Sequence, residues 1–246
     1  MINFKITYKL IVFLLANIIL FSGCKKTDED EVDLIDVKKP LAFVFANTNS
    51  PLSGDFAQPI LKRTTGSRVP GISGSEMIFI SLYPEDTDPL YSRIAEGLKN
   101  QYDDSGLSYP AFVADGFNYG VDTNKFYNRL RLGINQKADI SLGQRLSLED
   151  SNLQINIKMK YLKDVTYQHS FAVYVVFRSF SEAQRSSTGT NNFYAHGNVV
   201  RTSLTDVLGV PLSASDQDQE KDFDFSYDIE DFSVDNIMIA VVIYKT

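Results

Sequence analysis

Residues 41–54 read L-A-F-V-F-A-N-T-N-S-P-L-S-G, an apolar run and then a polar turn that leads into a possible short helix. The apolar run is typical of a strand that is buried on both faces. Met77–Tyr83 is a second run of this kind. Pro59 lies between the two runs and has to fall in the first turn of the helix, because a proline further inside would break it. We therefore expect a strand, a helix and a second strand.

Two further helices are predicted before residue 138. Asp88 stands at the N-cap of the first and Pro89 at its first position, and its apolar stripe is Leu90, Ile94, Leu98 and Tyr102. Residues 109–113 form an extended apolar segment, and the second helix follows Asp122 with a stripe of Phe126, Leu130 and Ile134. This alternation of strands and helices predicts a small α/β domain over residues 40–137.

From Ala138 the apolar residues alternate with polar ones, as in strands of a sheet with one face in water. The predicted strands cover residues 140–142, 153–161, 171–177, 199–204, 223–229 and 237–244. Their natural packing is an antiparallel β-sandwich over residues 138–246. The fold class is therefore predicted as α+β, with two domains.

The beginning of the chain has the features of an export signal. Two lysines precede an apolar run, Ile11–Phe21, that is too short to span a bilayer. We interpret residues 1–23 as a signal peptide. Ser22 and Gly23 before Cys24 resemble a bacterial lipobox, although a phenylalanine replaces the usual leucine, and this resemblance implies cleavage before Cys24 and lipidation of its thiol. The alternative is an unmodified cysteine after an ordinary signal peptide.

Residues 24–39 are polar and mostly acidic, so they have little to bury, and we predict a flexible tether. In surface lipoproteins of Bacteroidota, a similar charged run after the cysteine directs export to the outer leaflet. A plain solvated linker is the alternative. Lipid chains on Cys24 would hold the protein on a membrane. We therefore expect a lipid-anchored protein of the outer membrane, with exposure at the cell surface as one option.

Composition excludes several classes of function. Removal of the signal peptide with its two lysines changes the formal charge from −7 to −9, which argues against nucleic acid as a partner. Cys24 is the only cysteine, so none is left for a thiol nucleophile or a thiolate metal site. The spacing of the only two histidines, His169 and His196, does not suit zinc. The acidic run 216–222 lacks the glycine of an EF-hand, so we expect no metal and no cofactor.

Three segments carry a resemblance to a known family. Residues 108–113 read S-Y-P-A-F-V, the strands 153–161 and 171–177 follow, and residues 194–201 read Y-A-H-G-N-V-V-R. Over residues 40–246 the chain resembles the lipoproteins related to the twenty-eight-kilodalton outer membrane protein (Omp) of Bacteroidota. This resemblance implies a thioredoxin-like first domain and an immunoglobulin-like β-sandwich as the second.

The resemblance gives a meaning to N-S-P-L-S-G at residues 49–54. Thioredoxin-like folds place a C-x-x-C pair after the first core strand, at the start of a helix whose dipole stabilises a thiolate. Ser50 and Ser53 have the same spacing, and Tyr109-Pro110 falls where such folds place a cis-proline. Serine cannot form a disulfide, so the resemblance implies a redox site that has lost its chemistry. The alternative is an ordinary Asn-Ser-Pro turn.

No base is evident for a catalytic serine. Both histidines lie in the predicted second domain, where we expect His196 to organise a loop or a strand start, and no G-x-S-x-G motif is present. We therefore expect a non-enzymatic binding or assembly protein of the cell envelope, with an envelope protein or a glycan as its partner. The alternative is a hydrolase or carbohydrate-active lipoprotein with unidentified acidic residues.

Two regions are candidates for the binding surface. An apolar groove beside the former redox site would be lined by Phe56, Tyr109, Phe112 and Phe117. The segment 179–192, S-F-S-E-A-Q-R-S-S-T-G-T-N-N, is long and polar, and we expect a mobile loop there.

Overall fold

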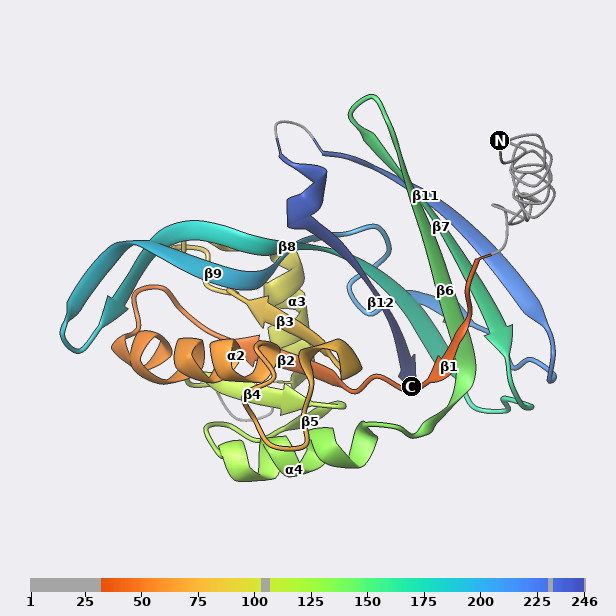
Figure 1. The fold of residues 1–246 in the computed structure, drawn as a ribbon, viewed down its shortest axis with the longest axis horizontal. Coiled ribbons are helices and arrows are strands. Elements are labelled where there is room, and N and C mark those ends of the chain that lie inside the picture. The colour runs from red at the N-terminus through yellow and green to blue at the C-terminus, as the bar shows by residue number, and fades with distance from the viewer. Residues whose placement is uncertain (1–31, 103–106, 230–231, 246) are drawn as a thin grey trace, which may run out of the picture. The chain divides into compact units, whose positions relative to one another are not determined.

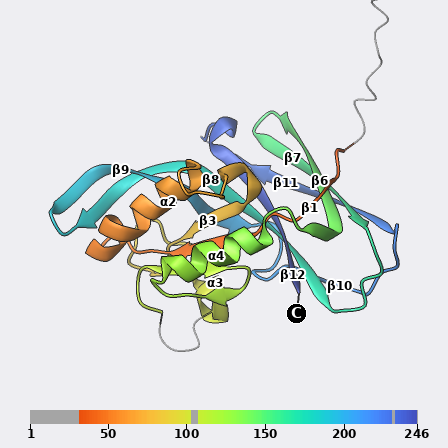
Figure 2. The ribbon, with the colours of Figure 1, turned by 60° about the horizontal axis from the view of Figure 1, so that its bottom comes forward.

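The computed structural model describes residues 32–102, 107–229 and 232–245. The predicted signal peptide, the predicted lipidation site at Cys24 and the first half of the predicted tether, residues 24–31, lie outside the described residues. Asp33–Thr246 forms one compact unit, which contains a smaller and a larger sheet (Figures 1 and 2). In the described ranges no helix is long and apolar enough to cross a membrane.

The first half of this unit is an α/β layer. Its elements are β2 (Leu41–Phe45), η1 (Ser53–Ala57), α2 (Gln58–Thr65), η2 (Gly74–Glu76), β3 (Ile78–Leu82), α3 (Arg93–Tyr102), β4 (Ala111–Ala114), β5 (Phe117–Asn118) and α4 (Thr123–Gly133). β2 pairs in parallel with β3 and antiparallel with β4, and β4 pairs antiparallel with β5, so the strand order is β3-β2-β4-β5. The predicted alternation of strands and helices is confirmed.

Both faces of β2 are buried, which explains its continuous apolar sequence. Ala42 and Val44 lie in one apolar cluster with side chains of α2 and α4, whereas Phe43 and Phe45 lie in another with side chains of α3. Successive side chains of a strand point to opposite faces of the sheet. A strand with helices on both faces therefore needs an apolar residue at nearly every position.

The first helix begins earlier than predicted. Residues 51–65 are helical throughout, with Pro51 at their start, whereas α2 itself begins at Gln58 and has Pro59 in its first turn, as predicted. Pro59 comes just after the π-helical turn of η1, where the ladder of backbone hydrogen bonds changes register. A proline is tolerated at such a point, because the regular bond that its missing N–H would have made is already interrupted.

The second helix begins later than predicted. α3 starts at Arg93, and its cap is Ser92, whose Oγ accepts the N–H of Ala95 at 3.2 Å. Asp88 is not a helix cap, because its carboxylate accepts an N–H within the turn that precedes α3. The predicted start of the third helix is confirmed, since α4 begins directly after Asp122, which caps it by accepting a hydrogen bond from its first turn.

The second half consists of antiparallel strands, as predicted. They are β6 (Lys137–Glu149), β7 (Asn152–Tyr161), β8 (His169–Ser186), β9 (Gly189–Ser203), β10 (Val210–Leu212), β11 (Glu220–Asp228) and β12 (Ile237–Lys245), with the short helix η3 (Val234–Asn236) before β12. β6, β7 and β11 belong to one sheet and β8, β9, β10 and β12 to the other. The two sheets face each other across a core that contains Ile155, Ile157 and Met159 of β7 and Val173, Val175 and Phe177 of β8.

β8 connects the sandwich to the α/β layer. Its side chains Val173 and Val175 face the sandwich core, whereas Ala172, Tyr174 and Val176 pack against side chains of β2 and α3. β9 pairs with β8 and, in parallel, with β3. The larger sheet therefore continues across residue 138, where the sequence pattern places a boundary between two domains.

The predicted tether ends before residue 39. β1 (Ile35–Val37) pairs antiparallel with β6, with Ile35 opposite Leu142 and Val37 opposite Lys137. Ser141 Oγ donates a hydrogen bond to the carbonyl oxygen of Ile35 at 2.8 Å. The acidic surroundings hid this strand, because two apolar residues are too few to give a recognisable alternation.

Candidate functional site

The segment predicted as a mobile polar loop is a β-hairpin with one shift of register, between Glu182 and Gln184. β8 continues to Ser186 and β9 begins at Gly189, and the two strands are paired from Ser179 opposite Gly197 to Ser186 opposite Gly189. We call residues 179–197 the hairpin arm. The prediction was wrong because hydroxyl and amide side chains mask the strand alternation. The arm extends over the helical segment that precedes and includes α2 (Figures 1 and 2).

Hydrogen bonds fix the hairpin arm to the turn that follows β2. Arg185 N–H donates to the carbonyl of Thr48 at 2.8 Å, and Gln184 Nε2 donates to the same carbonyl at 3.0 Å. Ser187 N–H donates to Asp55 Oδ2 at 2.9 Å. The start of the first helix is therefore covered by the chain's own arm.

The two serines of N-S-P-L-S-G lie in this covered turn. Ser53 is fully buried, and its Oγ accepts the N–H of Asn47 at 3.1 Å. Ser50 Oγ lies 3.4 Å from the N–H of Ser53, in the manner of a helix cap. At the adjacent Gly54 a Cβ would lie 2.2 Å from the carbonyl oxygen of Arg185, so the arm packs directly on the backbone. Both hydroxyls act within the turn, and no space is left for a substrate above Ser53.

Pro110 lies at the same end of the sheet as the serine turn. The Tyr109–Pro110 peptide bond is cis, as the sequence predicts. Phe45, the last residue of β2, pairs with Ala111, the first residue of β4, so Pro110 comes level with the point where the chain leaves β2 toward the serines. The register of β2 and β4 therefore brings Pro110 and the serine turn to the same end of the sheet.

Of the four aromatic residues predicted to line a groove, Phe56 and Phe112 are in contact, but the four do not line one groove. Phe112 is fully buried, with its ring centroid 5.2 Å from that of Phe126. Phe56 packs edge-on against Phe112 at 6.0 Å. Tyr109 belongs to the apolar cluster on the other face of the sheet, where its hydroxyl donates to Glu85. Phe117 is 56% exposed and lies under the guanidinium of Arg129. Tyr109 and Phe112 are three positions apart on an extended chain, so they point to opposite faces.

A buried polar cluster joins the arm to the α/β layer. Gln58 Nε2 donates to Tyr83 Oη at 2.8 Å, and Tyr83 Oη lies 2.8 Å from His196 Nδ1. His196 Nε2 lies 3.3 Å from the carbonyl oxygen of Glu182. In the tautomer that satisfies these contacts, Nε2–H donates to the carbonyl and Nδ1 accepts the tyrosine proton. His196 thus lies inside β9 rather than at a loop, and it ties three elements together.

Burial controls the protonation of this cluster. The side chains of Gln58, Tyr83 and His196 are at most 1% exposed. Desolvation lowers the pKa of His196 to about 4 and raises the pKa of Tyr83 well above its usual range. His196 is therefore neutral at pH 7, and both of its ring nitrogens already have partners. It is not available as a base for Ser50 or Ser53.

Asp88 and His169, which the sequence analysis also singled out, form hydrogen bonds that hold parts of the fold together. Asp88 Oδ2 accepts both the N–H of Thr48 at 2.7 Å and its hydroxyl at 3.0 Å, and burial raises the pKa of this carboxyl. His169 is buried at the start of β8, with Nε2 2.9 Å from Tyr161 Oη. The sequence gives no sign of either contact, because the partners lie on separate elements.

The acidic residues of β11 do not form a cleft. Asp222, Asp224 and Asp228 are exposed and alternate with half-buried aromatic residues, as predicted for the wet face of a strand. Asn156 Nδ2 donates to Asp224 Oδ1 at 2.9 Å. Such a row does not flank a substrate as the two acids of a glycosidase do. Within the described ranges no group of three His, Cys, Asp or Glu residues is placed to hold a metal ion.

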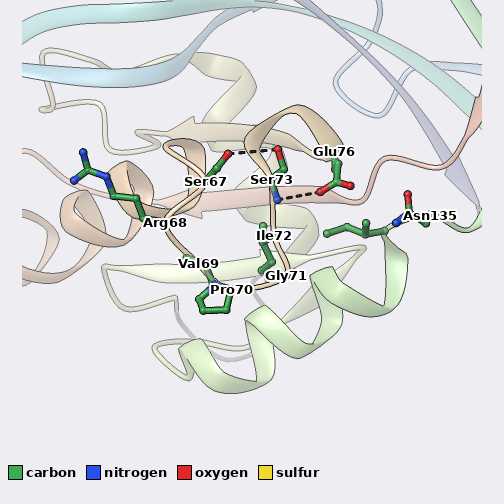
Figure 3. A pocket seen from close by; sticks show the side chains of 10 residues that line it. Ser67, Arg68, Val69, Pro70, Gly71, Ile72, Ser73, Glu76 and Asn135 are labelled. Carbon is green, nitrogen blue, oxygen red and sulfur yellow. Dashed lines mark hydrogen bonds between the residues drawn. The ribbon is translucent and has the colours of Figure 1, made fainter.

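A shallow surface hollow lies between the 67–76 segment and the end of α4 (Figure 3). Its polar groups bond to one another, since Ser73 N–H donates to Glu76 Oε2 at 3.1 Å and the hydroxyls of Ser67 and Ser73 lie 3.4 Å apart. Glu76 and Ser73 form the capping box of η2. The polar groups of Ser67, Ser73 and Glu76 are thus used in capping this turn.

The comparison with known proteins gives one structural neighbour. No family model and no curated protein matches the chain. The solved structure of HBP35 of Porphyromonas gingivalis matches with a TM-score of 0.66 and 12% sequence identity, and the match covers 86% of this chain and 70% of that chain. At this identity the match shows a shared fold alone.

Proposed function

We propose that this chain is a non-enzymatic lipoprotein of the cell envelope that acts as a binding or assembly module on the outer membrane. The observation that carries the proposal is the covered serine turn. The position that a redox pair would occupy holds a fully buried Ser53, with the backbone of Arg185 packed against Gly54. An active site has to admit its substrate, and this one is closed by the chain itself.

The topology supports a degenerate thioredoxin-like layer. The strand order β3-β2-β4-β5, with β4 antiparallel to β2, fits such a layer, and so does the cis bond before Pro110. Ser50 and Ser53 then stand for the lost thiols. The two facing antiparallel sheets of the second half are compatible with an immunoglobulin-like sandwich.

The outward side of the hairpin arm is the binding surface that we favour. Phe193 on β9 is 86% exposed, and Asn191, two positions earlier, is exposed as well. The exposed polar residues Thr188, Thr190 and Asn192 also lie in this end of the arm. An aromatic ring beside amide and hydroxyl groups suits a protein partner or a glycan. The arm is already fixed by its bonds to the serine turn, so little ordering cost would be added on binding.

The experiment is a comparison of captured partners from crosslinked envelopes, with the lipidated full-length chain as bait. We expect Phe193→Ala to lose the specific partner and Phe117→Ala to keep it. Phe117 is the matched control, because it is also an exposed aromatic residue but lies on β5, outside the arm. Equal capture by wild type and Phe193→Ala would remove the arm from the proposal.

The membrane anchor is tested separately. Labelled palmitate should enter the wild-type chain but not Cys24→Ser, because the thiol of Cys24 is the proposed site of lipidation. Equal labelling of the two chains would refute the anchor. That result would leave the reading of the covered serine turn unchanged.

A further inference from the structure

The helical segment of residues 51–65 has three sides with different surroundings. Its buried side consists of Ser53, Ala57, Gln58, Ile60, Leu61 and Thr64. A second side contacts the hairpin arm. There Asp55 Oδ2 accepts the N–H of Ser187 at 2.9 Å. One and a half turns later, Lys62 Nζ lies 4.2 Å from the centroid of the Tyr194 ring. The third side is exposed, and we call it the outward stripe: Leu52, Phe56, Pro59 and Arg63.

The outward stripe is apolar where a surface helix normally carries polar residues. Leu52 is 63% exposed and Phe56 is 36% exposed. Pro59 and Arg63 follow at spacings of three and four residues, so they lie on the same side of the helix. A surface helix usually turns one apolar stripe toward the core and polar residues toward water. The core stripe of this helix is already present on its buried side. The second apolar stripe therefore indicates a contact outside the fold.

The end of the outward stripe is positively charged. The stretch 56–75 contains no acidic residue and three cations, Lys62, Arg63 and Arg68, in a chain whose formal charge is −7. The flanking acids, Asp55 and Glu76, accept backbone N–H groups. Among the described residues, no ion pair joins Arg63 or Arg68 to a carboxylate. The helix dipole favours cations in the last turn of α2, but Arg68 lies beyond this helix. Its side chain points away from the other residues of the surface hollow (Figure 3).

Apolar side chains next to cations match the surface of an anionic bilayer. In a helix that lies on a membrane, the apolar side chains enter the boundary of the acyl chains, and lysine and arginine meet the phosphates. The proposed lipid on Cys24 would bring such a surface close to this chain. Residues 24–34, between that lipid and β1, reach at most roughly 40 Å when fully extended. The anchor by itself therefore leaves open which side of the chain meets the bilayer.

We propose that the outward stripe is a second contact with the membrane, at a surface that contains anionic lipid. Leu52 and Phe56 lie at the boundary of the acyl chains, and Arg63 and Arg68 lie at the phosphates. This contact rests on the membrane anchor of the proposed function. The lipid holds the chain on the membrane, and the outward stripe determines which side of the α/β layer faces it.

The test uses tryptophan as a reporter, because the chain contains none. The lipidated full-length chain is placed on vesicles of phosphatidylglycerol and phosphatidylcholine whose acyl chains carry bromine, which quenches tryptophan fluorescence on contact. Leu52→Trp places the reporter on the outward stripe. The matched control is Val210→Trp, which is also an exposed apolar position, at 43% exposure. It lies on β10, which pairs with the end of β8 that is far from the hairpin arm.

We expect the bromine to quench Leu52→Trp several-fold more than Val210→Trp. Adding Arg63→Glu to Leu52→Trp replaces an attraction to the phosphates by a repulsion and should weaken the contact by roughly tenfold or more. The matched control for the charge is Arg93→Glu, which should leave the quenching unchanged. Arg93 is also exposed, but it lies on α3, which covers the other face of the sheet. Vesicles of phosphatidylcholine alone should give the low quenching of the Arg63→Glu variant.

Flotation of the chain with the vesicles measures the anchor separately. A chain that floats but shows equal quenching at positions 52 and 210 would overturn the membrane contact and leave the anchor intact. Equal quenching with and without Arg63→Glu, or an equal loss from Arg93→Glu, would overturn it as well. A chain that stays in solution would refute the anchor, and the membrane contact with it.

Discussion

Acid should lower the free energy of unfolding through His196, whose ring is neutral and lies between Tyr83 and the carbonyl of Glu182. Its pKa is about 4 in the folded state, against about 6.5 in an unfolded chain. Below pH 6.5 the unfolded state therefore binds a proton that the folded state does not bind. The contribution of neutral His196 to the free energy of unfolding is therefore fully present above pH 6.5 and is lost as the pH falls toward 4. Below pH 4 this group causes little further change.

The size of the effect follows from the shift of the pKa. Between pH 7.5 and pH 5 this one group should remove about 2 kcal/mol from the free energy of unfolding, and at most about 3 kcal/mol by pH 4. Solvent does not reduce this contribution by screening, because the side chain of His196 is fully buried. Urea denaturation of the chain without its lipid, measured across this pH range, gives the quantity directly.

The informative comparison is with His196→Gln, which keeps a polar side chain in β9 but cannot be protonated. We expect the variant to be less stable at pH 7.5, because Tyr83 Oη loses the ring nitrogen that accepts its proton. Its stability should then be nearly constant down to pH 5. Parallel loss of stability in wild type and His196→Gln over this range would show that His196 is not the titrating group, and the reasoning would fail.

Three further outcomes follow from the covered serine turn. Gly54→Ala should lower the free energy of unfolding, measured in urea, by roughly 2 kcal/mol or more, because its Cβ would clash with the carbonyl oxygen of Arg185. An unchanged value would mean that the arm does not pack against residue 54. The double change Ser50→Cys with Ser53→Cys should not produce insulin reduction, because position 53 is buried, and turnover would show that the arm opens. Asp88→Ala should cost roughly 2–4 kcal/mol in thermal or urea unfolding, because it leaves two N–H groups and a hydroxyl without their acceptor, and a cost below about 1 kcal/mol would contradict this.

Most helices and strands could be predicted from the sequence, because burial of one or both faces of an element produces a regular pattern of apolar residues. β2 is apolar throughout, since helices cover both of its faces, and β7 alternates, since one of its faces is in water. The strand at the apolar run of β8 was predicted correctly, but the sequence did not show what covers both of its faces. It packs on the sandwich with one face and on the α/β layer with the other, and a single strand does not reveal which partner covers its second face.

The candidate site was less predictable than the fold. Gln58, Tyr83 and His196 come from elements far apart in the chain, so no spacing rule connects them. The signal that was present is a histidine between apolar strand residues in Y-A-H-G-N-V-V-R, which indicates a buried and bonded ring. The hairpin arm left no such signal. Its two strands are paired by hydrogen bonds between backbone groups, which do not depend on the polarity of the side chains.

The hairpin arm and the presence of serine at position 53 are consistent with each other. A cysteine at position 53 would lie buried beneath the arm, where desolvation raises the pKa of a thiol and removes the nucleophile that exchange requires. Once serine occupies that position, close packing of Arg185 on Gly54 stabilises the arm without any loss of reactivity. The same packing holds Phe193 outward on a fixed strand. Under the proposed function, the packing that closes the serine turn also presents the opposite side of the arm to a partner.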